Sequence, residues 1–199
     1  MAAKLDPSQR INLKQTNVLL LDGNAQALDA MRRTLSGFGV SQLRTCDVVA
    51  GARSAIEAQS FHLVIADPLV SDEDGFEFLR WIRRHPSVNK CVPVIAALGH
   101  GTLGNIQAAR DAGANFVVAK PVSPQVLLQR IEWIARENRQ FIEAPNYVGP
   151  DRRFKNVGPP AGSRGRRADD LSAEVPSAAE PNMSQFEVDE LLKPRKVVL

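Results

Sequence analysis

Three charged residues each follow an apolar run directly, and together they could support phosphoryl chemistry. Asp22 ends NVLLLD, Asp67 ends FHLVIAD, and Lys120 follows NFVVA. If these runs are parallel strands of one sheet, their carboxyl ends meet at one edge, and two carboxylates and one ammonium group converge there. A single charge at a strand end often serves only to stay hydrated, but three in one series indicate a site.

The expected chemistry follows from the residue types. Two neighbouring carboxylates resist joint ionisation unless a cation lies between them, and Mg²⁺ suits oxygen ligands of this kind. A carboxylate can also attack phosphorus to give an acyl phosphate, while a metal and a lysine neutralise the phosphoryl oxygens. The pattern therefore predicts Asp67 as acceptor, Asp22 as metal ligand and Lys120 as phosphate-binding residue.

The elements that must position these residues form an alternating series over residues 17–139. Helix-like stretches lie between the strand-like runs, with Asp47 and Ser123 as expected N-caps and Pro124 at the first helical position. Runs that are apolar throughout are typical of strands buried on both faces, which favours a doubly wound α/β domain with a parallel sheet. The expected strands are 17–22, 43–46, 61–67, 92–98 and 115–119.

The remainder of the chain has a different composition. Residues 151–167 carry six basic residues and one acid, whereas residues 168–190 carry seven acids and no base. Such separated charge blocks, rich in proline, predict a largely disordered linker over residues 140–182. The predicted organisation is an N-terminal extension (1–16), the α/β domain (17–139), this linker, and a short amphipathic helix with the chain end (183–199).

Composition excludes some classes of function. The net charge of +3 is only mildly basic, so the chain as a whole gives no strong case for nucleic-acid binding. No apolar run is long enough to span a membrane, and the first ten residues lack the apolar core of a signal peptide, so we expect a cytoplasmic protein. Cys46 and Cys91 lie in apolar contexts and are predicted to be reduced, buried thiols.

Paired arginines in the basic block leave two interpretations open. Arg152–Arg153 and Arg166–Arg167 lie beside glycines and aromatic residues, a composition that suits phosphate groups or acidic surfaces. A cyclic dinucleotide or a nucleic acid could bind there. The alternative is a solvated linker that pairs loosely with the acidic block after it.

Residues 17–137 resemble the receiver domain of bacterial two-component response regulators, the flavodoxin-like fold of CheY. The likeness rests on an aspartate that ends the third strand with a glycine eight residues later, Asp67 and Gly75, and on VVAKP, which contains Lys120 and Pro121. The family usually makes that Lys-Pro peptide bond cis. The stretch AARDAGANF also matches the family's approach to the lysine.

The resemblance implies roles and partners. Asp67 would be the phosphoacceptor, Lys120 would bind the phosphoryl group, and Asp22, Asp67 and the backbone carbonyl of Leu69 would hold Mg²⁺. The phosphoryl group would come from a histidine kinase or a phosphotransfer protein. The Mg²⁺ and the acceptor together imply a signalling protein of a phosphorelay or chemotaxis-like system.

Three positions depart from the family pattern. The first strand ends in Leu21 and Asp22 instead of two acids, Leu98 stands where a count back from Lys120 places serine or threonine, and Val117 replaces the usual aromatic residue. Two hypotheses remain open. The chain is an atypical receiver that keeps phosphoryl chemistry, or it is a degenerate pseudo-receiver that works as a phosphorylation-independent binding or scaffold module.

The C-terminal helix is the expected output element, since no DNA-binding or catalytic motif follows the receiver and no enzyme activity is expected. Ser184 and Glu187 form a capping box, and MSQFEVDELL resembles the N-terminal peptide of the flagellar switch protein. We expect this helix to dock in cis or on a second copy, over the fourth helix, fifth strand and fifth helix. The alternatives are an acidic disordered tail, or docking on another protein such as a flagellar or chemotaxis component. The anchors would be Val188, Leu191 and Leu192.

Overall fold

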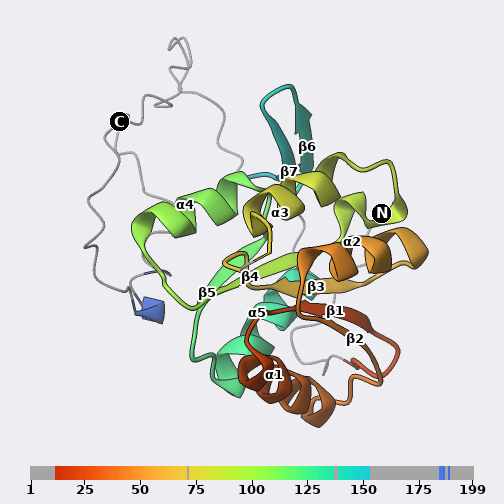
Figure 1. Cartoon of the computed structure of the whole chain (residues 1–199), viewed down its shortest axis with the longest axis vertical. Helices are drawn as coiled ribbons and strands as arrows, with labels where there is room; N and C mark the ends of the chain where they lie inside the picture. Colours follow the sequence, from red (N-terminus) through yellow and green to blue (C-terminus); the bar gives the residue numbers. More distant parts are fainter. Residues whose placement is uncertain (1–11, 71, 137–138, 153–183, 187, 189–199) are drawn as a thin grey trace.

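The computed structural model describes residues 12–70, 72–136, 139–152, 184–186 and 188. Its centre is a five-stranded parallel sheet in the order β2-β1-β3-β4-β5 (Figure 1). This is the doubly wound α/β architecture that the alternating runs predicted. The strands are β1 Asn17–Leu21, β2 Gln42–Cys46, β3 Leu63–Ala66, β4 Val94–Leu98 and β5 Phe116–Ala119.

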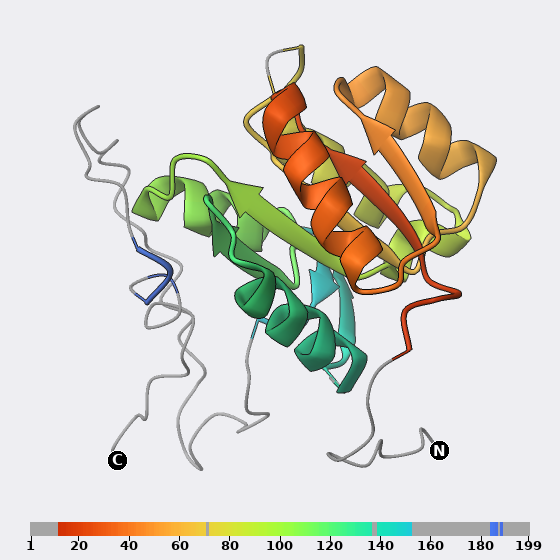
Figure 2. The ribbon, with the colours of Figure 1, turned by 90° about the horizontal axis from the view of Figure 1, so that it is seen from below.

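Apolar side chains on both faces of the sheet hold the helices against it. The residues of β3 and β4 are all buried, as their continuous apolar runs require. One core cluster joins the sheet to α2, α3 and α4, and the other joins it to α1 and α5. Figure 2 views the sheet from the side that α1 and α5 cover. The helices are α1 Ala25–Gly37, α2 Val49–Ala58, α3 Gly75–Arg84, the 3₁₀ turn η1 Val88–Cys91, α4 Leu103–Asp111 and α5 Pro124–Arg136.

Side-chain caps start most of these helices. Asn24 caps α1, Asp74 caps α3 and Thr102 caps α4, each by accepting a backbone N–H of the first turn. Ser123 accepts from the Val126 amide at the start of α5, as predicted. The expected cap at Asp47 is wrong, because α2 begins after Val48 with no side-chain cap of its own.

A β-hairpin follows α5, so the prediction of a disordered linker from residue 140 is wrong for residues 141–150. Strands β6 Phe141–Ala144 and β7 Tyr147–Pro150 pair antiparallel. The Tyr147 hydroxyl donates to the Pro150 carbonyl at 2.6 Å, and an added Cβ at Gly149 would lie 2.9 Å from the Cα of Gly113. The charge and proline content of the surrounding residues hid this short apolar hairpin.

Arg83 connects the hairpin to the amino ends of β4 and β5. Its guanidinium donates to the carbonyls of Val92 and Gly113 at 2.6–3.0 Å, and it lies 5.7 Å from the centre of the Phe141 ring. Burial lowers the pKa of Arg83 to about 10. Because carbonyl oxygens satisfy this buried cation, α3, the sheet and the hairpin form one unit.

The two cysteines differ in exposure. Cys46 is buried at the end of β2, and burial raises the pKa of its thiol. Cys91 is exposed, contrary to the prediction, because it ends the η1 turn on the surface before β4 begins. Both are free thiols.

Some predictions fall partly outside the described residues. Of the paired arginines, only Arg152 is described, and it pairs with Asp111 at 2.7 Å and stacks on the Tyr147 ring. Most of the extension at 1–16, most of the linker, and Glu187, Leu191 and Leu192 lie outside them. Among the helices that the structure describes, none has the length and apolarity needed to cross a membrane.

Candidate functional site

The three charged residues lie at the carboxyl ends of three strands, and a backbone bond to a neighbouring strand fixes each of them. The Asp22 amide donates to Cys46, the Asp67 amide donates to Leu21, and the Lys120 amide donates to Leu98, at 2.8–3.1 Å. The peptide bond between Lys120 and Pro121 is cis. Hydrogen bonds of the sheet therefore fix the backbone positions from which these three side chains extend.

The side chains meet as the sequence predicted. The Lys120 Nζ lies 2.5 Å from Asp22 Oδ2 and 2.6 Å from Asp67 Oδ2. The three side chains are only 11–17% exposed, so water screens these ion pairs less than it screens pairs on the surface. One ammonium group bridges two carboxylates, which leaves a formal charge of −1 at the site.

Backbone amides orient the two carboxylates. Asp22 Oδ1 accepts from the Asn24 amide and Asp67 Oδ1 accepts from the Leu69 amide, both at 2.9 Å. In each carboxylate one oxygen therefore faces its own loop and the other faces Lys120. A carboxylate held on both sides is preorganised either to bind a cation or to act as a nucleophile.

The donor chemistry of the site fits Mg²⁺. Two carboxylates with a nearby backbone carbonyl are enough for an ion that keeps several of its waters. In the part of the chain that the structure describes, no group of three or more acidic, histidine or cysteine residues could hold a metal ion. A cation at Asp22 and Asp67 would compete with the Lys120 ammonium for the same two oxygens.

Leu98, the position predicted to stand where the family has serine or threonine, ends β4, and this assignment stays a prediction. Ala66 of β3 pairs with Ala96 of β4, so Asp67 and Ala97 each follow the last paired residue of these two strands. A small cavity is lined by Ala97 together with both aspartates, whereas Leu98 belongs to the core cluster on the other face.

None of Leu21, Ala97 and Leu98 supplies a hydroxyl group near Asp22 and Asp67, which we call the acid pair. The methyl group of Ala97 cannot donate a hydrogen bond to a phosphoryl oxygen, and Leu21 is a fully buried core residue. The Thr102 hydroxyl accepts from the Asn105 amide as the cap of α4. Val117 is buried among apolar residues of β5 and α4.

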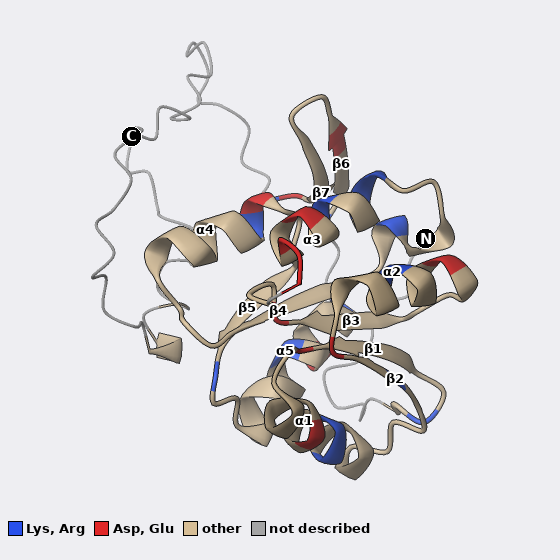
Figure 3. Cartoon of the chain, viewed as in Figure 1, with Lys and Arg blue, Asp and Glu red and all other residues tan. Residues whose placement is uncertain are grey.

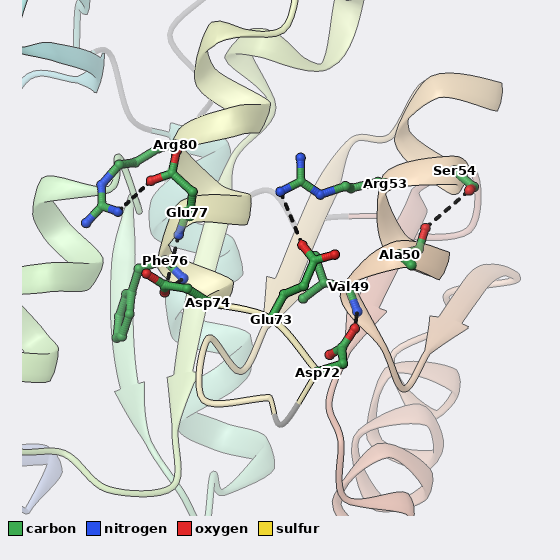
Figure 4. Close-up of polar contacts among 10 residues, drawn as sticks. All are labelled: Val49, Ala50, Arg53, Ser54, Asp72, Glu73, Asp74, Phe76, Glu77 and Arg80. Carbon is green, nitrogen blue, oxygen red and sulfur yellow. Dashed lines mark hydrogen bonds and ion pairs between the residues drawn. The ribbon is translucent and has the colours of Figure 1, made fainter.

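The loop between β3 and α3 carries the acceptor and is tied to α2 (Figure 4). Asp72 Oδ2 accepts from the Val49 amide at 2.8 Å, and Glu73 pairs with Arg53 at 3.4 Å. An added Cβ at Gly75 would lie 2.5 Å from the Pro68 carbonyl oxygen, so only glycine fits there. Figure 3 shows this acidic loop in red before α3. The sequence reading missed the role of Asp72, whose partner is distant in the chain.

The described part of the C-terminal segment contacts the far edge of the sheet. Gln185 Oε1 accepts from the Ala119 amide at 2.8 Å, and the Val188 amide donates to the Ser184 carbonyl in a helical turn. The Val188 side chain is fully buried. Figure 1 shows this segment, in blue, on the side of the molecule where β5 and α4 lie. The sequence predicted Val188 as an anchor but gave no role to Gln185.

Comparison with known proteins identifies this architecture. Residues 18–132 match the family model described as the response regulator receiver domain. The chain is 32% identical over 120 residues to the transcriptional regulatory protein GltR of Pseudomonas aeruginosa, which covers 60% of this chain and 49% of that protein. It is 27% identical over 119 residues to the probable chemotaxis protein CheY of Rhizobium etli, covering 60% of this chain and 92% of that one.

Solved structures agree with the sequence comparisons. A putative response regulator from Chloroflexus aurantiacus superposes with a TM-score of 0.58 at 26% identity, over 61% of this chain and 98% of its own. The chemotaxis response regulator CheY4 of Vibrio cholerae shares the fold, with a TM-score of 0.55 at 23% identity over 60% and 98% of the two chains. The chain spans about half the length of GltR and of the transcriptional regulatory protein BasR of Escherichia coli, two of the relatives that it matches.

Proposed function

Because the chain belongs to the response regulator receiver domain family, we propose that it accepts a phosphoryl group on Asp67 and signals by binding another protein. One observation carries this proposal: Lys120 Nζ lies within 2.6 Å of both Asp22 and Asp67, at the carboxyl ends of three strands. Buried ion pairs add little net stability compared with apolar packing, so phosphoryl chemistry accounts for this buried triad better than a structural role alone.

In the proposed step, one carboxylate oxygen of Asp67 attacks the phosphorus atom of the donor. A new O–P bond forms, the bond from phosphorus to the leaving group breaks, and the leaving group departs with its electron pair. The Lys120 ammonium shifts from the carboxylates to the transferred oxygens. When bound by Asp22, Asp67 and the Leu69 carbonyl, Mg²⁺ would neutralise charge on the phosphoryl group.

The proposed donors are a histidine kinase or a phosphotransfer protein, and the proposed setting is a cytoplasmic two-component or chemotaxis-like system. The two longer relatives are named as transcriptional regulators, whereas the relative that this chain covers almost fully is named as a chemotaxis protein. The downstream partner would be a flagellar, chemotaxis or kinase component.

Leu21 and Leu98 support a second candidate function, a pseudo-receiver that binds partners without phosphorylation. An acid at position 21 would help to order metal-bound water, and a hydroxyl at position 98 would contact the phosphoryl group. Leucine can do neither. In this second candidate, the ion-paired triad serves only to hold the three strand ends together.

Incubation of the full chain with acetyl phosphate and Mg²⁺, followed by intact mass measurement, separates the two functions. The first predicts a Mg²⁺-dependent gain of one phosphoryl group that Asp67→Asn abolishes. Asp29→Asn, which alters a surface carboxylate on α1, is the matched control and leaves the gain in place. An unchanged mass with acetyl phosphate and with a promiscuous histidine kinase would establish the pseudo-receiver.

A further inference from the structure

The edge of β5 holds a backbone donor that the C-terminal segment satisfies. β5 is the last strand of the sheet, and successive N–H groups of a strand point to opposite sides. The Lys120 amide faces β4 and donates to Leu98, so the Ala119 amide faces away from the sheet. Gln185 Oε1 accepts that outward N–H at 2.8 Å. The glutamine side chain thus takes the place of a further strand.

A second contact lies on the same side of the segment. Val188 is fully buried in the core cluster that contains Val117 of β5 and Ile106 and Ala109 of α4. Gln185 and Val188 are three residues apart in a helical turn, so they share one face. One polar and one apolar anchor therefore fix both the position and the orientation of the segment. We call the surface formed by Val117, Ala119, Ile106 and Ala109 the β5–α4 surface.

We propose that the segment carrying Gln185 and Val188 is an internal ligand of the β5–α4 surface, docked in cis, and that a protein binding there must displace it. The surface adjoins the acid pair, because Ala119 directly precedes Lys120. A partner that binds along β5 next to the acid pair would therefore have to contact this segment. The inference goes beyond phosphoryl transfer and does not depend on it.

The chain is long enough for docking in cis. Arg152 is the last described residue before the segment, and the 31 residues from 153 to 183 separate it from Ser184. A chain of that length spans at most about 110 Å, several times the width of a small domain. Attachment to the same chain gives the segment an effective concentration on the order of millimolar, so even a weak site is occupied.

A labelled peptide of residues 180–199 tests the proposal by competition with the segment in the full chain. Val188→Asp places a charge at the buried anchor and releases the segment, so the free surface becomes available. We expect the peptide to bind the Val188→Asp chain at least tenfold more tightly than the unaltered chain. Val88→Asp is the matched control, because Val88 is 80% exposed and the same change there leaves peptide binding weak.

Hydrogen exchange at the Ala119 amide gives a second measurement on the same proteins. We expect Gln185→Ala and Val188→Asp each to speed exchange at this amide by about tenfold or more, with the Val88→Asp chain unchanged. Equal peptide affinity for all chains, or no binding to the Val188→Asp chain at millimolar peptide, overturns the proposal. A dimer that becomes a monomer on Val188→Asp, seen by light scattering, also overturns it, because the occupant would then be a second copy.

None of these measurements requires phosphorylation. If Asp67 gains no phosphoryl group but the competition appears, the proposed function fails and the internal ligand stands. If Asp67 is phosphorylated but the peptide binds all chains equally, the internal ligand fails and the proposed function stands.

Discussion

The carboxylate of Asp72 accepts a 2.8 Å hydrogen bond from the backbone amide of Val49, 23 residues earlier in the chain. The helix α2 has no side-chain cap of its own, so a residue of the acceptor loop caps it instead. This bond holds the loop that carries Asp67 against the second helix. Stability of α2 and the position of the acceptor loop therefore depend on one carboxylate.

Asp72→Ala is expected to lower the free energy of unfolding by about 1 kcal/mol, the usual cost of losing a helix N-cap. Urea denaturation of the full chain measures this. Asp47→Ala is the matched control: Asp47 is exposed next to the start of α2, is not its cap, and its loss is expected to cost nothing measurable. An equal loss for both variants would show that the acceptor loop does not cap the helix.

Replacement of Lys120 by methionine tests the ion-paired triad. Two mostly buried carboxylates would then face each other without a cation, and we expect the free energy of unfolding at neutral pH to fall by about 3 kcal/mol. Thermal or urea unfolding provides the measurement. Lys14→Met, which removes an exposed lysine, is the control and should change little. A stable Lys120→Met chain would mean that the two carboxylates do not need the ammonium group.

Mg²⁺ is expected to raise the melting temperature of the full chain, because an ion that binds the folded form stabilises it by mass action. Asp22→Ala should remove this gain, since it deletes one of the two carboxylates at the site. Asp29→Ala removes an exposed carboxylate on α1 and should keep the gain. If the gain survives Asp22→Ala, the ion binds elsewhere on the chain.

The sequence was enough to place the acid site, because the site depends on where strands end. Continuous apolar runs predicted the strands, and the order of a parallel sheet then brought Asp22, Asp67 and Lys120 to one edge. Ala97, which lines a small cavity with both aspartates, was not singled out, because the sequence does not show which residue of β4 faces that cavity.

The features that sequence reasoning missed share one cause, which is that their partners lie far away in the chain. Asp72 caps a helix that begins 23 residues earlier, and Gln185 reaches an amide 66 residues earlier. The composition around the hairpin also hid it, because its packing at Gly149 depends on Gly113, which lies 36 residues earlier in the chain. Local pattern predicts elements, whereas contacts of this kind come from their packing.

The two thiols should react at very different rates. Cys91 is exposed, whereas Cys46 is buried at the end of β2 and burial raises the pKa of its thiol, so less of the reactive thiolate forms. With a disulfide reagent at pH 8 we expect one thiol to react quickly and the second only on unfolding in urea. In Cys91→Ser the quick phase should vanish. Two quick phases in the native chain would contradict the burial of Cys46.

The Tyr147 hydroxyl donates to the Pro150 carbonyl inside the hairpin. Tyr147→Phe deletes this bond and should lower the free energy of unfolding by about 1 kcal/mol at neutral pH.

Burial also raises the pKa of Tyr147 above its ordinary value of 10.0. Above pH 10 the unfolded chain therefore loses a proton that the folded chain keeps, and stability falls as the pH rises further. Since phenylalanine cannot ionise, the unfolding free energy of Tyr147→Phe should fall less steeply over that range. Urea denaturation of both chains between pH 8 and pH 11 makes the comparison, and parallel pH profiles would show that Tyr147 is exposed to water in the folded protein.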